Sequence, residues 1–164
     1  MSRAEIRVLL GLIDQAFDQK SWHGTNLRGS LRGLTSRQAL WRPAPGRHNI
    51  REIVLHAAYW KYVVRRRLRK EKRGTFPLKG SDWFTPEELT ETAWRGDVQL
   101  LVETHESMRS AIGDLRPSEL YKTPSGGKVS NFTLISGVAA HDLYHAGQIQ
   151  LIKRLGAKSK KAKS

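Results

Sequence analysis

Hydrophobic residues recur three and four positions apart in four long stretches of the chain, which is the spacing of one apolar helix face. The first stretch covers about residues 3–20, and its stripe consists of Ile6, Leu10, Ile13 and Phe17. No stretch alternates convincingly with the period of two that is typical of a half-buried strand. The pattern therefore predicts an all-α chain with little or no sheet.

Capping signals place the starts of the next two long helices. Asn49 begins the second helix, with Glu52 as its partner in a capping box, and this helix is expected to run to about Lys72. Thr85 as the cap and Pro86 in the first turn are predicted to begin the third. Each of these helices would present one apolar face to a common core.

The fourth long helix is predicted over about residues 131–155, and Gly156 is expected to end it. Polar residues interrupt its inward stripe for nearly two turns. The stripe consists of Leu134, Val138, His141, His145, Gln148 and Ile152. Leucine or isoleucine would ordinarily occupy the polar positions, so these residues are candidates for chemistry.

The segments between the long helices exceed the short turns of a simple up-and-down bundle. One or two short helices are expected over residues 25–42, the second opening at a capping box of Thr35 and Gln38. One helical turn is expected near Ser118. The sequence therefore predicts a four-helix bundle with long connections, at least one of which can cross over.

The chain of 164 residues has a formal net charge of +14, with clusters at RRRLRKEKR (residues 65–73) and in the lysine-rich end. Both clusters lie at predicted helix C-termini, where positive charge is favourable. The alternative is a basic helical module that binds nucleic acid without catalysis, although the chain carries no recognisable reader motif. We expect one domain over residues 1–156 and a disordered basic tail over 157–164.

Membrane and secretory signals are not expected in this sequence. No apolar run approaches the ~20 residues that cross a bilayer. Glu5 and Asp14 argue against a signal peptide in the first twenty residues. Cysteine is absent from the sequence, which excludes disulfides, thiolate metal ligands and cysteine nucleophiles. Cytoplasm is the expected location.

Three histidines fall on the inward stripes of two different predicted helices. His56 lies on the second helix, and His141 and His145 lie one turn apart on the last, so that the pair can reach one ion. Neutral imidazole suits zinc, nickel, copper and ferrous iron. Three nitrogens leave coordination positions for water or substrate, which is the layout of a catalytic metal site. Buried histidines that are satisfied by carbonyl groups or water are the alternative.

Three neighbouring polar residues are candidates for orienting these imidazoles: Gln148, Asp142 and Glu52. Each has a structural alternative. Gln148 can bond to a neighbouring helix, Asp142 can face solvent, and Glu52 can be committed to capping.

Other aromatic and histidine side chains are expected to have structural roles. Trp60, one turn after His56, is expected to form a wall of the site. His105 is expected in the core or at its rim rather than as a ligand, and His23 is expected in a loop.

The segments FTLISGVAAHDLYHAGQIQLIKR, SWHGTNLRGSLRGL and HNIREIVLHAAYWKYVVRRRL resemble the DinB-like (damage-inducible B) superfamily, which is related to mycothiol- and bacillithiol-dependent transferases. The resemblance covers about residues 5–155. It implies a four-helix bundle in up-down-down-up order, often dimeric. It also implies a divalent metal held by one histidine of the second helix and an H-x-x-x-H pair of the last. Those positions match His56, His141 and His145.

The resemblance leaves the reaction open. Some members transfer a low-molecular-weight thiol to an electrophile and others are described as metal hydrolases, so a thiol S-transferase and a hydrolase both remain. Zinc and nickel are the expected metals, iron and manganese are the alternatives, and a low-molecular-weight thiol is a candidate cofactor. The expected partners are a small-molecule substrate and a second copy of the chain, whereas membrane and nucleic acid are not favoured.

Overall fold

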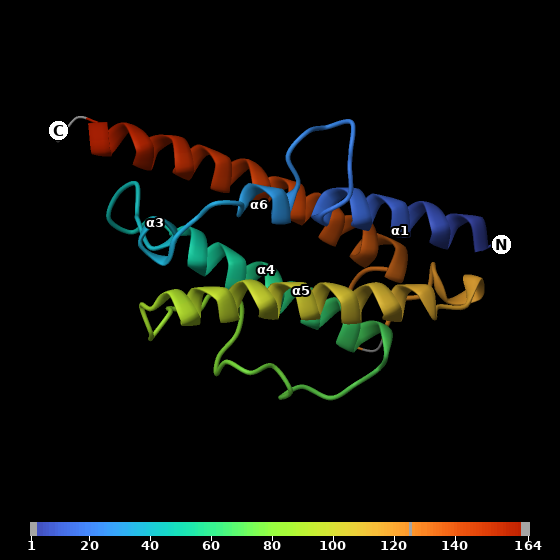
Figure 1. Cartoon of the computed structure of the whole chain (residues 1–164). Helices are drawn as coiled ribbons and strands as arrows, with labels where there is room; N and C mark the ends of the chain where they lie inside the picture. Colours follow the sequence, from blue (N-terminus) through green and yellow to red (C-terminus); the bar gives the residue numbers. More distant parts are fainter. Residues whose placement is uncertain (1–2, 125, 162–164) are drawn as a thin grey trace.

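A computed structural model of the chain describes residues 3–124 and 126–161. Four long helices form an elongated bundle (Figure 1): α1 (Arg3–Phe17), α4 (Ile50–Leu68), α5 (Glu91–Gly113) and α6 (Asn131–Lys161). The shorter elements are α2 (Leu27–Ser30), α3 (Ser36–Ala39) and the 3-10 turn η1 (Pro117–Glu119). Within these described ranges there is no strand, which confirms the predicted all-α fold class.

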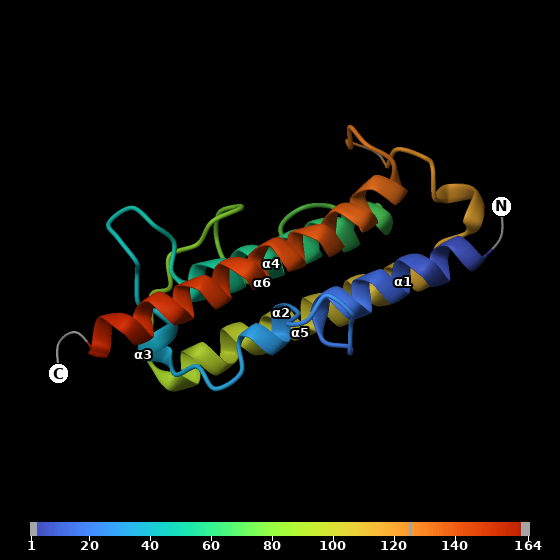
Figure 2. The same cartoon turned by 90° about the horizontal axis from the view of Figure 1, so that it is seen from above.

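The long helices follow an up-down-down-up order. Figures 1 and 2 show α1 and α6 running in one direction and α4 and α5 running in the other. α4 packs against both α5 and α6, and α1 packs against α6 and α5. Because α4 and α5 run the same way, residues 69–90 must return along the outside of the bundle (Figure 1). None of the described helices is long and apolar enough to cross a membrane.

Both predicted capping boxes are present. The Asn49 side chain accepts the N–H of Glu52 at 2.9 Å, and the Glu52 carboxylate accepts the N–H of Asn49 at 3.3 Å. Thr35 and Gln38 make the same reciprocal pair at the start of α3. The predicted helical turn near residue 118 is η1. Local backbone chemistry therefore determined these starts.

The predicted start of the third long helix was wrong. α5 begins at Glu91 rather than at Thr85, and Thr90 is its N-cap. The Ser36 hydroxyl donates to the Leu89 carbonyl at 3.1 Å, and the Ser36 N–H donates to the Glu91 carboxylate at 2.7 Å. These tertiary bonds hold the chain at the entry to α5 in a non-helical path, and so they override the local start signal.

α4 ends at Leu68, before the predicted end near Lys72. Lys70 adopts a left-handed backbone conformation with φ 57°. The N–H of Glu71 donates to the carbonyl of Arg66 at 2.9 Å. This is a Schellman closure, which satisfies the last carbonyl groups of the helix and turns the chain out of it.

The prediction that Gly156 ends the last helix was also wrong. α6 continues through residues 157–161, and the remainder of the expected tail, 162–164, lies outside the described residues. A Cβ atom at Gly156 would lie 3.2 Å from the Trp41 ring. The glycine therefore allows α6 and Trp41 to pack closely, instead of capping the helix. α1 ends at Phe17, short of its predicted end near residue 20.

The core consists of two apolar clusters with a polar layer between them. One cluster includes Ile13 and Ile135, and the other includes Ile53 and Ile149. The layer between them contains residues that are buried although they are polar or charged: Lys61 of α4, His105 of α5 and Asp142 of α6. Apolar side chains therefore fill the two ends of the core, and polar or charged side chains fill the layer between them.

Lys61 and Asp142 form an ion pair whose side chains are both 0% exposed. Burial lowers the pKa of Lys61 and raises the pKa of Asp142, and their mutual attraction opposes both shifts. The Lys61 Nζ atom also lies 5.0 Å from the centre of the Phe17 ring. Such a pair adds little net stability, but removal of one partner leaves the other charge buried and alone.

We expect Asp142→Ala to lower the free energy of unfolding by about 3–5 kcal/mol, because Lys61 then remains buried without a counter-ion. The double variant Lys61→Met/Asp142→Leu removes both charges and should lose much less. Arg69→Ala, which breaks an exposed pair with Asp114, is the control and should cost less than about 1 kcal/mol. Urea unfolding of metal-free protein measures all three, and equal losses in the single and double variants would contradict the assignment.

Candidate metal centre

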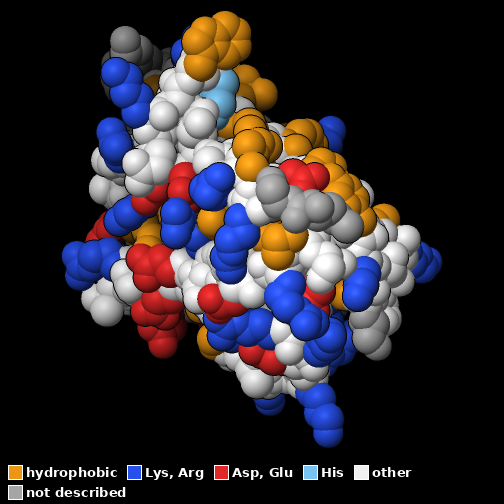
Figure 3. All heavy atoms as spheres, turned by 90° about the vertical axis from the view of Figure 1, so that its right-hand side faces the viewer, with side chains coloured by type: hydrophobic (Ala, Val, Ile, Leu, Met, Phe, Trp, Pro, Cys, Tyr) orange, Lys and Arg blue, Asp and Glu red, His pale blue; other side chains and the backbone are white. Residues whose placement is uncertain are grey.

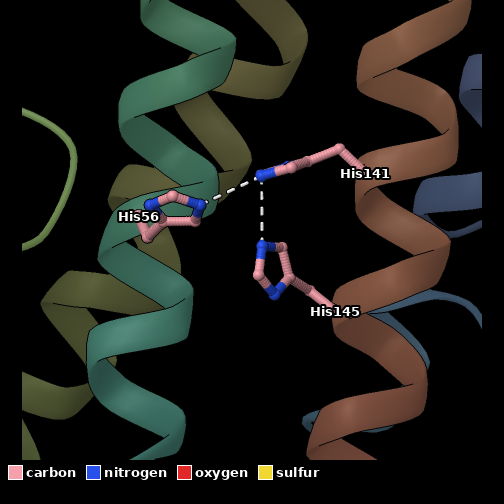
Figure 4. Close-up of side chains that lie close together, drawn as sticks. All are labelled: His56, His141 and His145. Carbon is pink, nitrogen blue, oxygen red and sulfur yellow. Dashed lines mark hydrogen bonds between the residues drawn. The ribbon is translucent and has the colours of Figure 1, made fainter. Parts of the chain in front are cut away.

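Two neighbouring helices bring three imidazoles together. His56 of α4 points toward His141 and His145, which lie one turn apart on α6 (Figure 4). The Nε2 atom of His141 lies 3.0 Å from that of His56 and 3.1 Å from that of His145. The candidate ligand atoms of the three residues all lie within 4.8 Å of one another. The structure thus joins the three histidines that the sequence singled out.

The opposite ring nitrogens of two of these histidines are held by hydrogen bonds. The Nδ1–H of His56 donates to the main-chain oxygen of Asp82 at 2.9 Å, and that of His145 donates to the Oε1 atom of Gln148 at 2.7 Å. Because both partners are acceptors, they select the Nδ1–H tautomer. The Nε2 lone pairs of both rings are therefore directed to the point where the three rings meet.

Residues 82 and 83, in the connection between α4 and α5, cover His56. The Trp83 ring stacks on His56 at 3.9 Å and on His48 at 3.6 Å between centroids. The Trp60 Nε1–H donates to the Asp82 carboxylate at 2.8 Å. Trp60 thus helps to form the wall of the site, as the sequence suggested, through its bond to Asp82.

Sequence reasoning did not find Asp82 or the stacking role of Trp83. Both lie in a connection without helical periodicity, and the bond to His56 uses the main-chain oxygen of Asp82, which any residue type carries. The φ angle of Asp82 is 70°, a left-handed conformation that aspartate tolerates better than most residues. Gly80 (φ 105°), two residues before Asp82, is the nearest sign in the sequence of an unusual turn.

All three imidazoles are neutral at pH 7. Burial lowers the pKa of His141 to about 3, and repulsion from His145 and His56 adds to this effect. Burial also lowers the pKa of His145 to about 4, against the bond to Gln148, and lowers the pKa of His56. The neutral form is the one that binds metal ions.

The arrangement fits a single divalent ion. Nitrogen ligands about 2.0–2.1 Å from one zinc ion lie roughly 3 to 3.5 Å from one another, and the two Nε2 separations, 3.0 and 3.1 Å, match this range. Hydrogen bonds from the remote ring nitrogens to oxygen acceptors are usual for metal-binding histidines. The Nδ1 atom of His141 is buried without a partner among the described residues.

The three candidate orienting residues have different partners. Gln148 reaches His145, and its Nε2 atom donates to the Tyr144 hydroxyl at 3.2 Å, so that both ends of the amide have hydrogen-bond partners. Asp142 is fully buried rather than facing solvent, and it pairs with Lys61 because it projects about 100° around α6 from His141.

The Glu52 side chain bonds to groups other than the site histidines. Besides capping α4, its carboxylate pairs with Arg42 and lies 3.0 Å from the Nδ1 atom of His48. These bonds, chiefly the one to Arg42, keep the pKa of Glu52 below its usual value although burial opposes them. Neither Glu52 nor Asp142 contacts a site histidine through a hydrogen bond within the described ranges.

The two remaining histidines that the sequence discussed lie away from the centre. His105 is buried and stacks on Phe17 with 3.6 Å between ring centroids. Burial lowers the pKa of His105 to about 2, and the charge of Lys61 adds to the shift. His23 is exposed in the loop after α1. Both placements agree with the structural roles expected for them.

The fold and the three imidazoles define a four-helix bundle with a candidate histidine metal centre. A sequence profile of the DinB superfamily matches residues 19–149, and the chain therefore belongs to the DinB superfamily. No curated protein matches the chain. The crystal structure of a conserved protein of a locus from Enterococcus faecalis is similar, with a TM-score of 0.68 and 14% sequence identity over 93% of this chain and 96% of that one. At this identity, the likeness supports the fold alone.

We predict that His105 makes the protein less stable in mild acid. The unfolded chain protonates this residue near pH 6.5, whereas the folded chain keeps it neutral down to about pH 2. The stability that depends on neutral His105 is therefore present above pH 6.5 and is lost as the pH falls. Between pH 7 and 5, wild type should lose about 2 kcal/mol more than His105→Leu.

Urea unfolding of both metal-free proteins at pH 7, 6 and 5 measures this difference. The site histidines titrate in both proteins, so that only the contribution of His105 remains in the comparison. Parallel stability curves for the two proteins would show that His105 is not buried in the neutral form.

Proposed function

We propose that this member of the DinB superfamily is a metal-dependent enzyme that acts on a small-molecule substrate. His56, His141 and His145 would hold one divalent ion, with zinc or nickel first and iron or manganese as the alternatives. The observation that carries the proposal is the convergence of three neutral Nε2 atoms from two helices. Donor atoms from three side chains alone leave room for exchangeable ligands, as in catalytic rather than structural sites.

A divalent ion at this position would lower the pKa of a bound water molecule or thiol to near neutrality. Residues of the chain orient the imidazoles and shield them from water. Asp82 and Gln148 hold two imidazoles in their binding tautomer, and Trp83 excludes water from one face of His56. Tyr144, 64% exposed and bonded to Gln148, lies at the solvent side of the centre.

Two reactions follow from this chemistry. With a low-molecular-weight thiol as cofactor, the thiolate sulfur would form a bond to an electrophilic carbon of the substrate while the bond from that carbon to its leaving group breaks, and the protein would be a thiol S-transferase. With water, the reaction is hydrolysis of the substrate. Assays that combine the metal-loaded protein with thiols and electrophiles, or with hydrolysable esters and amides, distinguish the two reactions.

Metal content tests the proposal. Protein purified without a nickel column should contain close to one equivalent of divalent metal by elemental analysis. His141→Ala removes the nitrogen between the other two and should reduce the content to near zero. His23→Ala alters an exposed loop histidine and should leave the content unchanged. Equal metal content in His141→Ala and wild type would overturn the assignment.

Gln148 should contribute to metal affinity through His145. We expect Gln148→Leu to weaken the affinity for Zn²⁺ by about 10- to 100-fold, because the Nδ1–H of His145 loses its acceptor. Gln150→Leu, on the same helix but without a hydrogen bond to a site histidine, is the matched control. Competition with a chromophoric chelator measures both affinities, and an unchanged affinity in Gln148→Leu would show that the bond does not support the ligand.

A further inference from the structure

The basic cluster at residues 65–73 divides into paired and unpaired arginines. Arg65 forms an ion pair with Glu71 at 2.7 Å, and Arg69 forms one with Asp114 at 3.3 Å. The arginines of the cluster without a carboxylate partner in the described part of the chain are Arg66, Arg67 and Arg73. On the face of the bundle at which α4 and α5 terminate, Lys and Arg side chains are more prominent than Asp and Glu side chains in the lower part of the view (Figure 3). Exposure of a helix end to solvent does not explain why only some of these arginines have carboxylate partners.

The three unpaired arginines line one cavity. It has a volume of about 660 Å³ and lies between α4 and the connection that follows it. Lys79 adds a fourth cation, and Asp82 is the one acidic residue in the lining. The walls between them are aromatic: Tyr59, Trp60, Tyr62 and Phe76. The volume is in the range of small-molecule sites, which combine apolar walls with a few charged groups.

Aromatic packing holds these walls in place. The Phe76 ring lies 5.3 Å from that of Tyr59 and 5.4 Å from that of Tyr62. The Tyr62 hydroxyl accepts the N–H of Thr75 at 3.3 Å. Phe84 closes the same cluster against Phe76 at 5.3 Å. The connection is therefore attached to α4 on both sides of the cavity, so that the site is largely formed before a ligand arrives.

One end of the cavity adjoins the histidine centre. Trp60 and Asp82 line the cavity, and Asp82 also binds His56 through its main-chain oxygen. The Asp82 carboxylate accepts the Trp60 N–H and lies 3.2 Å from the Nδ1 atom of His56. The only negative charge in the lining is thus engaged at the end near the metal centre, whereas Arg66, Arg67 and Arg73 belong to the last turn of α4 and the residues just after it.

The cations in the cavity lining lack carboxylate partners among the described residues, and this favours the binding of an anion. The negative end of the α4 dipole favours cations near its last turn, which explains why they are tolerated but gives them no counter-ion. Guanidinium groups bind planar or tetrahedral oxyanions through paired N–H donors. Aromatic walls favour an apolar or aromatic body attached to that oxyanion.

We propose that this cavity binds a small aromatic or apolar molecule by an oxyanion group, a phosphate or a carboxylate. The anion lies among the cations beyond the aromatic walls, and the body extends along Tyr59 and Trp60 toward Asp82.

Calorimetric titration with phenyl phosphate and with benzoate at low salt tests the site. Wild type should bind one equivalent of at least one of them, and the tighter of the two identifies the oxyanion. Arg67→Gln/Arg73→Gln should weaken that binding by at least tenfold, because two charge-assisted contacts are lost. Arg95→Gln/Arg154→Gln has the same change in net charge, at exposed arginines outside the cavity lining, and should stay within twofold of wild type.

Location is read from the indole N–H signals of the five tryptophans in a proton–nitrogen correlation spectrum. Ligand addition should shift the Trp60 signal, assigned with Trp60→Phe, and leave the signals of the exposed Trp22 and the buried Trp94 in place. No binding of either probe, equal weakening in both double variants, or shifts that spare Trp60 would overturn the proposal.

The same titration of His141→Ala separates this inference from the proposed function. The cavity lining does not include that histidine, so probe binding should be retained when the metal site is destroyed. Retained binding together with metal-free wild type would leave the anion site standing and overturn only the proposed metal-dependent function. Loss of probe binding in His141→Ala, with the fold intact by circular dichroism, would contradict the cavity as the location.

Discussion

The buried ion pair between Lys61 and Asp142 is the constraint on which the centre of this bundle depends. Each charge is removed from water by the apolar clusters on either side, and only the other charge compensates it. A shift or rotation of α6 against α4 would separate the two. His141 directly precedes Asp142 on α6, and His56 lies near Lys61 on α4, so the helix register that satisfies the pair also brings the imidazoles together.

Topology explains why a long connection takes part in the site. α4 and α5 are parallel neighbours, so residues 69–90 must travel back along the bundle before α5 can begin. On this path the chain places Asp82 and Trp83 against His56, and it encloses the basic aromatic cavity beside α4. Loops held on a rigid scaffold commonly carry function. Here one connection serves both the ligand geometry and the neighbouring cavity.

Sequence reasoning succeeded where the information is local or periodic. The helical stripes predicted the four long helices, the capping boxes predicted two starts, and the His141–His145 spacing together with the resemblance indicated the histidine set. It failed where the local structure depends on a residue that is distant in the sequence. Hydrogen bonds from Ser36 shift the start of α5. Close packing against Trp41 accounts for the glycine at position 156. The ion pair with Lys61 allows Asp142 to be buried. Such pairings join positions far apart in the chain, and no local pattern encodes them.

We propose that the Nε2 atoms of His56, His141 and His145 bind one cation together. A zinc titration of metal-free protein, followed by nitrogen-15 NMR of the histidine side chains, tests it most directly. We expect the Nε2 signals of His56, His141 and His145 to move together to metal-bound values and to saturate at one equivalent, while the signals of His105 and His23 do not change. Saturation of fewer than these three, or response of His105 or His23 instead, would contradict it.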